Sequence, residues 1–434
     1  MLIFLRKIVD SHVQQNKPVG AATPWRARAA RPAWNASGLA RPGALVLSIG
    51  ALFATPARAE ISDTIHPFIA TSISHDDNLL RVADNPNGQN GAQSDTYKRV
   101  DGGVIFERPI GRQVLSGQAK FTRVSFDRFE ELDYNGKDVS AALAWELGNH
   151  VSGHVGMTYS ETLAPFADFH TEQRNLRIQK REYVDANWRF HPSWQTHAGF
   201  TREKFTYDLE AQRFSNRTED ATEFGVDYLA VSGSRVGFLL RKLKGTYPEH
   251  RTIGSAVLDD GYDQDEAKAN IYWALSGVTQ VQFVGGWVRR THTFFTLRDD
   301  SGTNGRVNVM WKPAGKVQYR AAAWREFAAV EGNFVSSSLN QGASAGAGWD
   351  ATAKIHVDGQ LRTETRDFSA IGGGAVPADL SDSSRSVTLA LTYAATPSIS
   401  LGLSANHDSR SGSPGIGTNS YTSNGVSFNA SAQF

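Results

Sequence analysis

Basic and aromatic side chains recur at alternate positions along several segments, and they indicate what chemistry this chain can perform. The candidates for contact with a bound molecule are Lys120, Arg181, Arg241, Tyr272, Arg306, Arg320, Trp324 and Arg362. Guanidinium and ammonium groups bind carboxylates and hydroxyls, and aromatic rings stack on flat apolar faces such as those of sugars. Acidic residues occupy similar positions, so a wall stiffened by salt bridges is an equal interpretation of the same pattern.

Signals for catalysis or a resident metal are weak. His150, His154, Ser152 and Ser160 share one strand parity, but no Gly-x-Ser-x-Gly turn accompanies them. The acidic runs at 75–78 and 259–263 offer oxygen ligands for calcium, but neither has the spacing of an EF-hand, and a solvated loop is the simpler interpretation. The chain has no cysteine, which excludes thiolate chemistry. We therefore predict no enzymatic activity and no cofactor.

The elements that carry these residues are predicted to be β-strands. The final ten residues alternate between apolar and small polar side chains and end on Phe434. Successive side chains of a strand face opposite sides, so Val426, Phe428 and Phe434 share one face. The same period of two predicts strands near 64–75, 95–107, 112–126, 138–148, 151–162, 177–190, 194–207, 221–232, 235–247, 264–275, 278–292, 303–312, 315–328, 339–350, 353–367, 384–395, 398–409 and 420–434.

The connections between these strands alternate in length. Eight short turns separate nine longer polar connections near 76–94, 127–137, 163–176, 208–220, 248–263, 293–302, 329–338, 368–383 and 410–419. Short periplasmic turns and long extracellular loops are typical of a transmembrane antiparallel up-and-down β-barrel. The pattern predicts about 18 strands, with 16 as the alternative count, and places both termini in the periplasm of a bacterial outer membrane.

Composition agrees with this fold class. A mean hydropathy of -0.37 and 21% charged residues exclude a bundle of membrane helices, whereas a barrel is apolar only at every second position. The net charge of +1 gives no support for nucleic-acid binding, which needs a clustered basic face.

Strand parity divides the side chains between lipid and lumen. An apolar set that includes Val309, Trp311 and Tyr319 is predicted to face lipid. The opposite parity carries Lys120, Glu146, His154, Arg181, Asp185, Arg189, Glu203, Asp227, Arg241, Lys268, Arg306, Arg320, Trp324, Glu326, Asp358, Arg362, Glu364 and Arg366. This split predicts a wet interior. Phe428 and Phe434 of the closing strand are the expected signal for the barrel-assembly machinery.

The N-terminal segment has the features of a signal peptide. Residues 43–54 form a short apolar core, Arg26, Arg28, Arg31 and Arg41 precede it, and Ala57-Arg58-Ala59 follows as a cleavage site. The prediction is a long leader over 1–59, cleavage after Ala59, and a barrel over 60–434.

Three segments carry a family resemblance: Phe68-Ile69-Ala70-Thr71-Ser72-Ile73-Ser74-His75-Asp76-Asp77-Asn78-Leu79-Leu80-Arg81, Leu163-Ala164-Pro165-Phe166-Ala167-Asp168-Phe169 and Arg174-Asn175-Leu176-Arg177. With the barrel length and the closing strand, they resemble outer-membrane proteins of exosortase-associated exopolysaccharide clusters, the EpsL-type export proteins. The resemblance spans residues 62–434 and implies export of a polysaccharide chain, with periplasmic export partners supplied by other proteins.

The sequence is compatible with three functions. The first is a conduit for polysaccharide export, and the second is a general or substrate-preferring diffusion porin. The third is a structural or adhesive barrel without transport. A porin should have a long loop folded into its lumen. The predicted loops are of similar length, with 76–94 the longest, and none dominates, so the export conduit ranks first.

Overall fold

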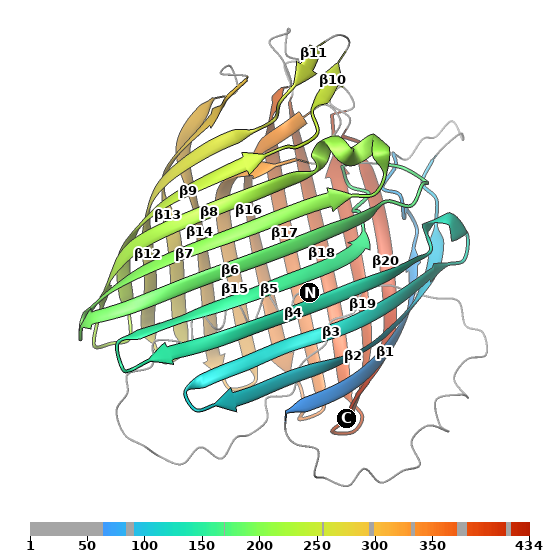
Figure 1. Ribbon diagram of the computed structural model, residues 1–434. Coiled ribbons are helices and arrows are strands. Elements are labelled where there is room, and N and C mark those ends of the chain that lie inside the picture. Colours follow the sequence, from blue (N-terminus) through green and yellow to red (C-terminus); the bar gives the residue numbers. More distant parts are fainter. Residues whose placement is uncertain are drawn as a thin grey trace.

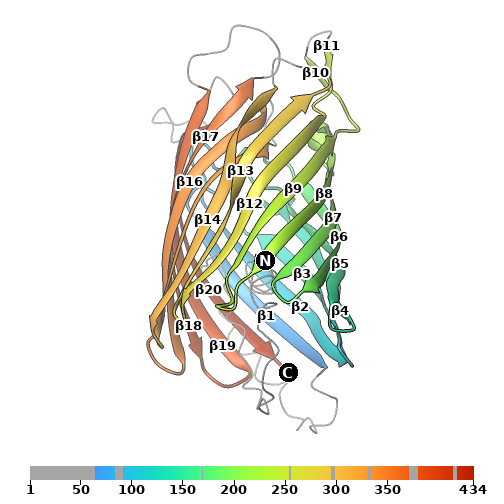
Figure 2. The same ribbon diagram turned by 90° about the vertical axis from the view of Figure 1, so that its left-hand side faces the viewer.

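The computed structural model describes residues 64–83, 91–168, 170–253, 256–294, 299–330, 335–370, 380–413 and 418–434. The described chain forms one antiparallel sheet of 18 strands that closes into a barrel (Figures 1 and 2). The barrel strands are β1 (Ile65–Asp76), β2 (Asp95–Ile110), β3 (Gln113–Phe126), β4 (Tyr134–Leu147), β5 (Val151–Leu163), β6 (Leu176–His191), β7 (Trp194–Tyr207), β8 (Arg217–Leu229), β9 (Arg235–Thr246), β12 (Tyr262–Ser276), β13 (Thr279–His292), β14 (Asp300–Ala314), β15 (Val317–Ala329), β16 (Val335–Asp350), β17 (Ile355–Ala370), β18 (Ser381–Ala394), β19 (Ile399–Ser411) and β20 (Tyr421–Gln433). The predicted fold class and strand count are confirmed, and the alternative of 16 strands is wrong.

Each barrel strand pairs with the next one along the chain, and the first strand closes the sheet against the last. Phe68 of β1 lies opposite Gln433 of β20, and the pairing continues to Asp76 opposite Gly425. The amide of Phe434 extends this ladder by donating to the carbonyl of Pro67 at 2.9 Å. Closure leaves no unpaired strand edge, which is the condition for a sheet to cross a bilayer.

The connections between strands differ in length at the two ends of the barrel, as the sequence predicted. Turns as short as residues 111–112 and 192–193 join strands at one end, and the longer connections lie at the other. Gly111 has a φ of +63°, a left-handed conformation that glycine adopts without strain. Figure 1 shows the C-terminal end of β20 at the short-turn end, opposite the hairpin formed by β10 and β11.

The two faces of the wall follow the predicted parity. Trp311 and Tyr319 face outward on neighbouring strands, 46% and 43% exposed, with their rings stacked 5.2 Å apart. The same outer surface carries an apolar set that includes Val155, Met157, Val184, Val236, Phe238, Phe283, Val387, Leu389, Leu403, Val426 and Phe428. Polar and charged residues occupy the alternate, inward positions. An apolar outer band of this kind matches lipid, and a polar inner face matches water.

No helix in the described part of the chain is both long and apolar enough to cross a membrane.

Some connections contain structure that alternation alone did not predict. A short hairpin of β10 (Arg251–Ile253) and β11 (Ala256–Leu258) stands in the connection between β9 and β12. Two 3-10 helices, η2 (Glu130–Leu132) and η3 (Glu210–Ser215), lie after β3 and β7. The connection predicted over 329–338 is shorter, because β16 already begins at Val335. These local elements have periods other than two, so the strand pattern does not reveal them.

The signal-peptide prediction and the cleavage after Ala59 concern residues outside the described part of the chain, and both stay predictions.

Candidate functional site: the bridged mouth of the barrel

Seven of the eight candidate contact residues are basic or aromatic groups whose polar atoms are bound to acidic partners on the inner wall. The contacts are Lys120 with Asp138 at 2.7 Å, Arg181 with Glu203 at 3.3 Å, Arg241 with Glu266 at 3.7 Å, Arg306 with Glu326 at 2.6 Å, Arg320 with Asp358 at 2.5 Å, Arg362 with Glu364 at 2.6 Å, and Trp324 Nε1 with Glu364 at 2.8 Å. The eighth, Tyr272, lies half-buried on β12 between Arg235 and Gln282 on the neighbouring strands. The salt-bridged wall is thus present in the structure.

The structure brings three of the eight candidates together around one indole ring. The guanidinium carbons of Arg306 and Arg362 lie 4.9 and 4.2 Å from the ring centroid of Trp324. These are cation–π distances, and the indole is only 6% exposed. The ring therefore has little free face on which a sugar could stack in this arrangement. Lys120, Arg181, Arg241 and Tyr272 lie on other strands around the wall.

The inward charged side chains are exposed beside this indole and become buried further along β17. The inward side chains of Arg306 and Arg362 remain 36% and 43% exposed. Toward the long-loop end, Arg366 follows Arg362 by four residues on β17 and is 15% exposed. Its neighbours Asp382 and Arg410 are 1% and 3% exposed. The inward charged groups are therefore more deeply buried at the end that carries the long loops.

Loop three, residues 164–175 between β5 and β6, contacts these buried groups through Asp168. Its Asp168 contacts Arg366 of β17 and Arg410 of β19, on another side of the barrel. Along the shorter way round the wall, β4, β3, β2, β1 and β20 separate β5 from β19. Loop three therefore spans the mouth instead of standing above its own two strands.

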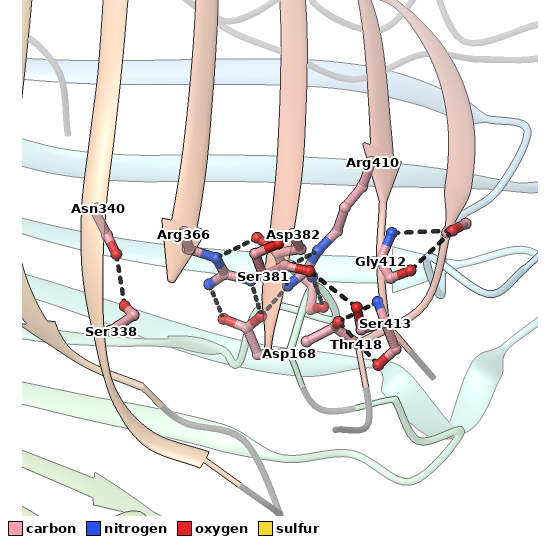
Figure 3. A network of polar contacts seen from close by, with 12 residues as sticks. Asp168, Ser338, Asn340, Arg366, Ser381, Asp382, Arg410, Gly412, Ser413 and Thr418 are labelled. Carbon is pink, nitrogen blue, oxygen red and sulfur yellow. Dashed lines mark hydrogen bonds and ion pairs between the residues drawn. The ribbon is translucent and has the colours of Figure 1, made fainter. Parts of the chain in front are cut away.

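Four residues, Asp168, Arg366, Asp382 and Arg410, form what we call the cross-barrel cluster (Figure 3). Arg366 donates through Nη1 and Nη2 to the two carboxylate oxygens of Asp168 at 3.1 and 2.8 Å. Arg410 donates from Nη2 to Oδ1 of the same carboxylate at 2.9 Å and also bonds the carbonyl of Ala167. Bidentate, charge-assisted bonds of this kind are among the strongest hydrogen bonds in proteins.

Asp382 holds the two arginines of the cluster from the wall side. Arg366 donates to it from Nε and Nη2 at 3.0 and 2.7 Å, and Arg410 from Nε at 2.8 Å. Two carboxylates thus balance two guanidinium groups, and only Asp168 comes from a loop. The cluster is the point at which loop three is fastened to the far wall.

An apolar cluster supports the other side of the mouth, and we call it the loop core. Its buried members are Leu79, Leu80, Val124, Phe126, Phe129, Leu132 and Tyr134, with Phe166 and Leu163 packed against them. They come from the connections after β1, β3 and β5 and from the inner faces of β3 and β4. Burial of these side chains away from water holds the three loops against each other and gives loop three a firm base.

The first resemblance segment anchors the connection after β1 to the closing strand. Arg81 binds Asp76 through Nη1 and Nη2, both at 2.9 Å, and Ser423 of β20 donates to Asp76 at 2.7 Å. Asn78 donates to the carbonyl of Thr422 at 3.0 Å. The interpretation of this acidic run as a solvated loop is wrong: Asp76 and Asn78 are buried and satisfied within the protein.

The other two resemblance segments comprise parts of loop three and the adjoining ends of β5 and β6, and Leu176 packs on the same loop core as Leu79 and Leu80 of the first segment. His170 Nδ1 lies 3.0 Å from the carbonyl of Leu80, and Phe166 packs on the loop core. Asn175 is buried, bonds Gln212 of η3, and accepts from the amide of Leu209 at 3.2 Å. All three segments therefore build the mouth of the barrel, which their separation in the sequence did not reveal.

Other reactive groups have partners on the wall. His154 Nδ1 lies 3.0 Å from Asp185, and Ser160 donates to Asp138 at 2.6 Å, so neither pairs with the other as base and nucleophile. In the second acidic run, Asp259 accepts from the amide of Gly261 at 2.8 Å. Among the described residues no group of three or more His, Asp or Glu is placed to hold a metal ion.

None of the four members of the cross-barrel cluster was among the eight candidate contact residues. Arg366 had the correct lumen parity, but Asp168 lies in a loop, and Asp382 and Arg410 stand at the ends of strands. One signal was present: Phe166-Ala167 places apolar residues just before Asp168 in an otherwise polar loop. Apolar residues in a loop indicate that it packs against something rather than extending into water.

A closed antiparallel barrel with an apolar outer band and a polar lumen is the architecture of bacterial outer-membrane proteins. The protein is an outer-membrane β-barrel of 18 strands. The family model described as "Putative beta-barrel porin 2" matches residues 263–434, which is the part of the wall from β12 to β20. That description is of a channel, in agreement with the prediction that the chain is not an enzyme.

No curated protein matches the sequence. Among solved structures, the chain is similar to the outer membrane protein opdK from Pseudomonas aeruginosa, with 10% identity over 86% of this chain and 99% of the other, and a TM-score of 0.44. OccAB3 of Acinetobacter baumannii gives 9% identity over 86% and 100%, with a TM-score of 0.44. The alcaligin receptor FauA from Bordetella pertussis gives 11% over 87% and 77%, with a TM-score of 0.41.

Proposed function

We propose that the protein is a substrate-preferring diffusion channel for small solutes in the outer membrane. The observation that carries this proposal is loop three, which crosses the barrel mouth and is fastened to the far wall by the cross-barrel cluster. A loop folded across the lumen limits the size of the solute that can pass. Paired charges around the remaining opening then select among the solutes that fit.

The inner wall suits brief contacts rather than tight binding. Arg306, Arg320 and Arg362 each have an acidic partner and remain about a third or more exposed to the lumen. A solute can exchange hydrogen bonds with such groups without leaving a buried charge unpaired. Weak, repeated contacts let a solute both enter and leave, as conduction requires.

The orientation follows from the general rule for these barrels. We place the short turns and both termini in the periplasm and the cross-barrel cluster at the extracellular mouth. Outer-membrane lipid is then the partner of the apolar band, and the barrel-assembly machinery is the expected partner of β20 through Phe428 and Phe434.

The export conduit for polysaccharide becomes the second candidate. It rests on the resemblance to EpsL-type proteins, and the segments of this chain that carry the resemblance lie together at the mouth of the barrel. Two features favour the channel for small solutes instead. Loop three obstructs the path of a long polymer, and Trp324, the strongest candidate for sugar stacking, is covered by Arg306 and Arg362. Periplasmic export partners belong to this second candidate only.

A swelling assay with liposomes that contain the refolded full chain separates the two. The channel proposal expects uptake of monosaccharides and amino acids, with a rate that falls steeply as solute size increases. Long-chain polysaccharide should neither enter nor slow the uptake of the small solutes. Rapid entry of the polymer, or a block of small-solute uptake by it, would favour the export conduit. No uptake of any solute would contradict both transport functions and leave the structural barrel.

A further inference from the structure

Arg366 and Arg410 present their guanidinium groups to one carboxylate, and that carboxylate is the only member of the cross-barrel cluster that belongs to a loop. We propose that the two arginines form a carboxylate-binding site for solutes that enter the mouth, and that Asp168 is its built-in occupant. This inference rests on the proposed channel function and names its preferred substrate class: small molecules that carry a carboxylate, such as uronic acids.

The site is built by the wall and not by loop three. Asp382 is 1% exposed and accepts bonds from Nε of both arginines at 3.0 and 2.8 Å. It thereby fixes the planes of the two guanidinium groups whether or not Asp168 is present. A pre-arranged pair of donors binds a carboxylate with less loss of side-chain freedom than two mobile arginines would.

Charge favours an anion at this position. Without Asp168, two guanidinium groups face a single wall carboxylate, and the three wall residues carry one net positive charge. Arg366 presents Nη1 and Nη2 as a fork to the two oxygens of Asp168. A solute carboxylate can take the same two bonds, whereas a hydroxyl of a neutral sugar offers one oxygen and no charge.

The position of the site links binding to passage. Asp168 fastens loop three across the mouth, so a solute carboxylate that takes its place on Arg366 and Arg410 also releases the loop. Asp168 and the solute compete for the same donors. If the arginines are free of Asp168 for about one-tenth of the time, the apparent affinity is about tenfold below that of the open site.

The test compares the wild type with Asp168→Ala, both as the full chain refolded in detergent micelles, in saturation-transfer NMR titrations. The probes are sodium glucuronate and, as the neutral match, glucose. We expect Asp168→Ala to bind glucuronate about tenfold more tightly than the wild type, with no change for glucose. The double variant Asp168→Ala/Arg366→Gln should lose this gain.

Asp358→Ala is the matched control, because it removes a lumen carboxylate from a single arginine, Arg320, rather than from a pair. Equal affinity of the wild type and Asp168→Ala for glucuronate would overturn the proposal, as would an equal gain in Asp358→Ala.

If the double variant does not fold, a competition experiment replaces it: sodium acetate should displace glucuronate from Asp168→Ala, and methanol should not. Failure of acetate to displace it would also overturn the proposal. Binding is measured without transport, so a barrel that binds but admits no solute contradicts the channel function and not the site.

Discussion

Asp382 is the buried carboxylate on which the cross-barrel cluster depends, and Asp382→Asn tests its role. The substitution keeps the size of the side chain and removes its charge. It leaves Arg366 and Arg410, which are 15% and 3% exposed, with Asp168 as their one remaining carboxylate partner in the cluster.

The expected loss follows from this burial. Removing one partner of a buried ion pair costs about 3–5 kcal/mol, because the remaining charge stays in a poorly solvated place. Asp168 still offers both oxygens, so we expect the free energy of unfolding to fall by about 3 kcal/mol, the lower end of that range. The control is Asp127→Asn, whose partner Lys98 is 53% exposed and lies 2.6 Å away. An exposed pair contributes about 0–1 kcal/mol.

The assay is urea unfolding of the barrel in lipid vesicles, followed by the fluorescence of the eight tryptophans in residues 60–434. We expect Asp382→Asn to unfold at a clearly lower urea concentration than both the wild type and Asp127→Asn. Equal midpoints for the two variants would refute the reasoning, because they would show that the cluster is solvated and does not fasten loop three.

Three further predictions concern the wall and the loop core. Val309→Arg, on the lipid face, should destabilise the barrel by about 2–4 kcal/mol, whereas Asn308→Arg, on the lumen face, should have little effect. Urea unfolding in vesicles measures both variants. Equal losses of stability would mean that the assignment of lipid and lumen faces is inverted on this strand. Phe434→Ser should lower the amount of heat-modifiable barrel in the outer membrane, and unchanged amounts would contradict the role of the closing strand in assembly. Leu132 is fully buried in the loop core, so Leu132→Ala should lower the local free energy of unfolding by about 2–5 kcal/mol. Amide hydrogen exchange in loop three should then become faster, and unchanged exchange would contradict this prediction.

The wall of the barrel was predictable because its physics is local and periodic. A residue such as Val309 must face lipid, and Asn308 must then face the lumen, so a period of two appears directly in the sequence. The ends of strands were less predictable. β16 begins at Val335, just before a run of three serines whose small polar side chains do not distinguish a strand from a loop.

The mouth of the barrel was not predictable in the same way, since its contacts join distant parts of the chain. Asp168 and Arg366 are 198 residues apart, and no periodic pattern relates them. Loop length was also a poor guide. The connection over 77–94 is longer than loop three, but among the described residues it is Asp168 of loop three that binds both Arg366 of β17 and Arg410 of β19. Loop three does so because Phe166 packs on the loop core while Asp168 finds two arginines opposite.

The chemistry of the wall residues chosen from the sequence depends on neighbours that the sequence did not assign. Arg306, Trp324 and Arg362 converge because β14, β15, β16 and β17 are adjacent and because Gly342 of β16 leaves room for the indole. A Cβ at position 342 would lie 2.4 Å from the Trp324 ring. Their role in contacting a solute stays a prediction.

The central claim is that loop three, fastened by Asp168, limits passage through the barrel, and single-channel conductance in a planar bilayer tests it most directly. We predict a small, steady conductance for the wild type and a larger conductance for Asp168→Ala. Asp127→Ala, which removes an equally charged loop residue outside the cross-barrel cluster, should match the wild type. A conductance of Asp168→Ala equal to or below that of the wild type would contradict the claim.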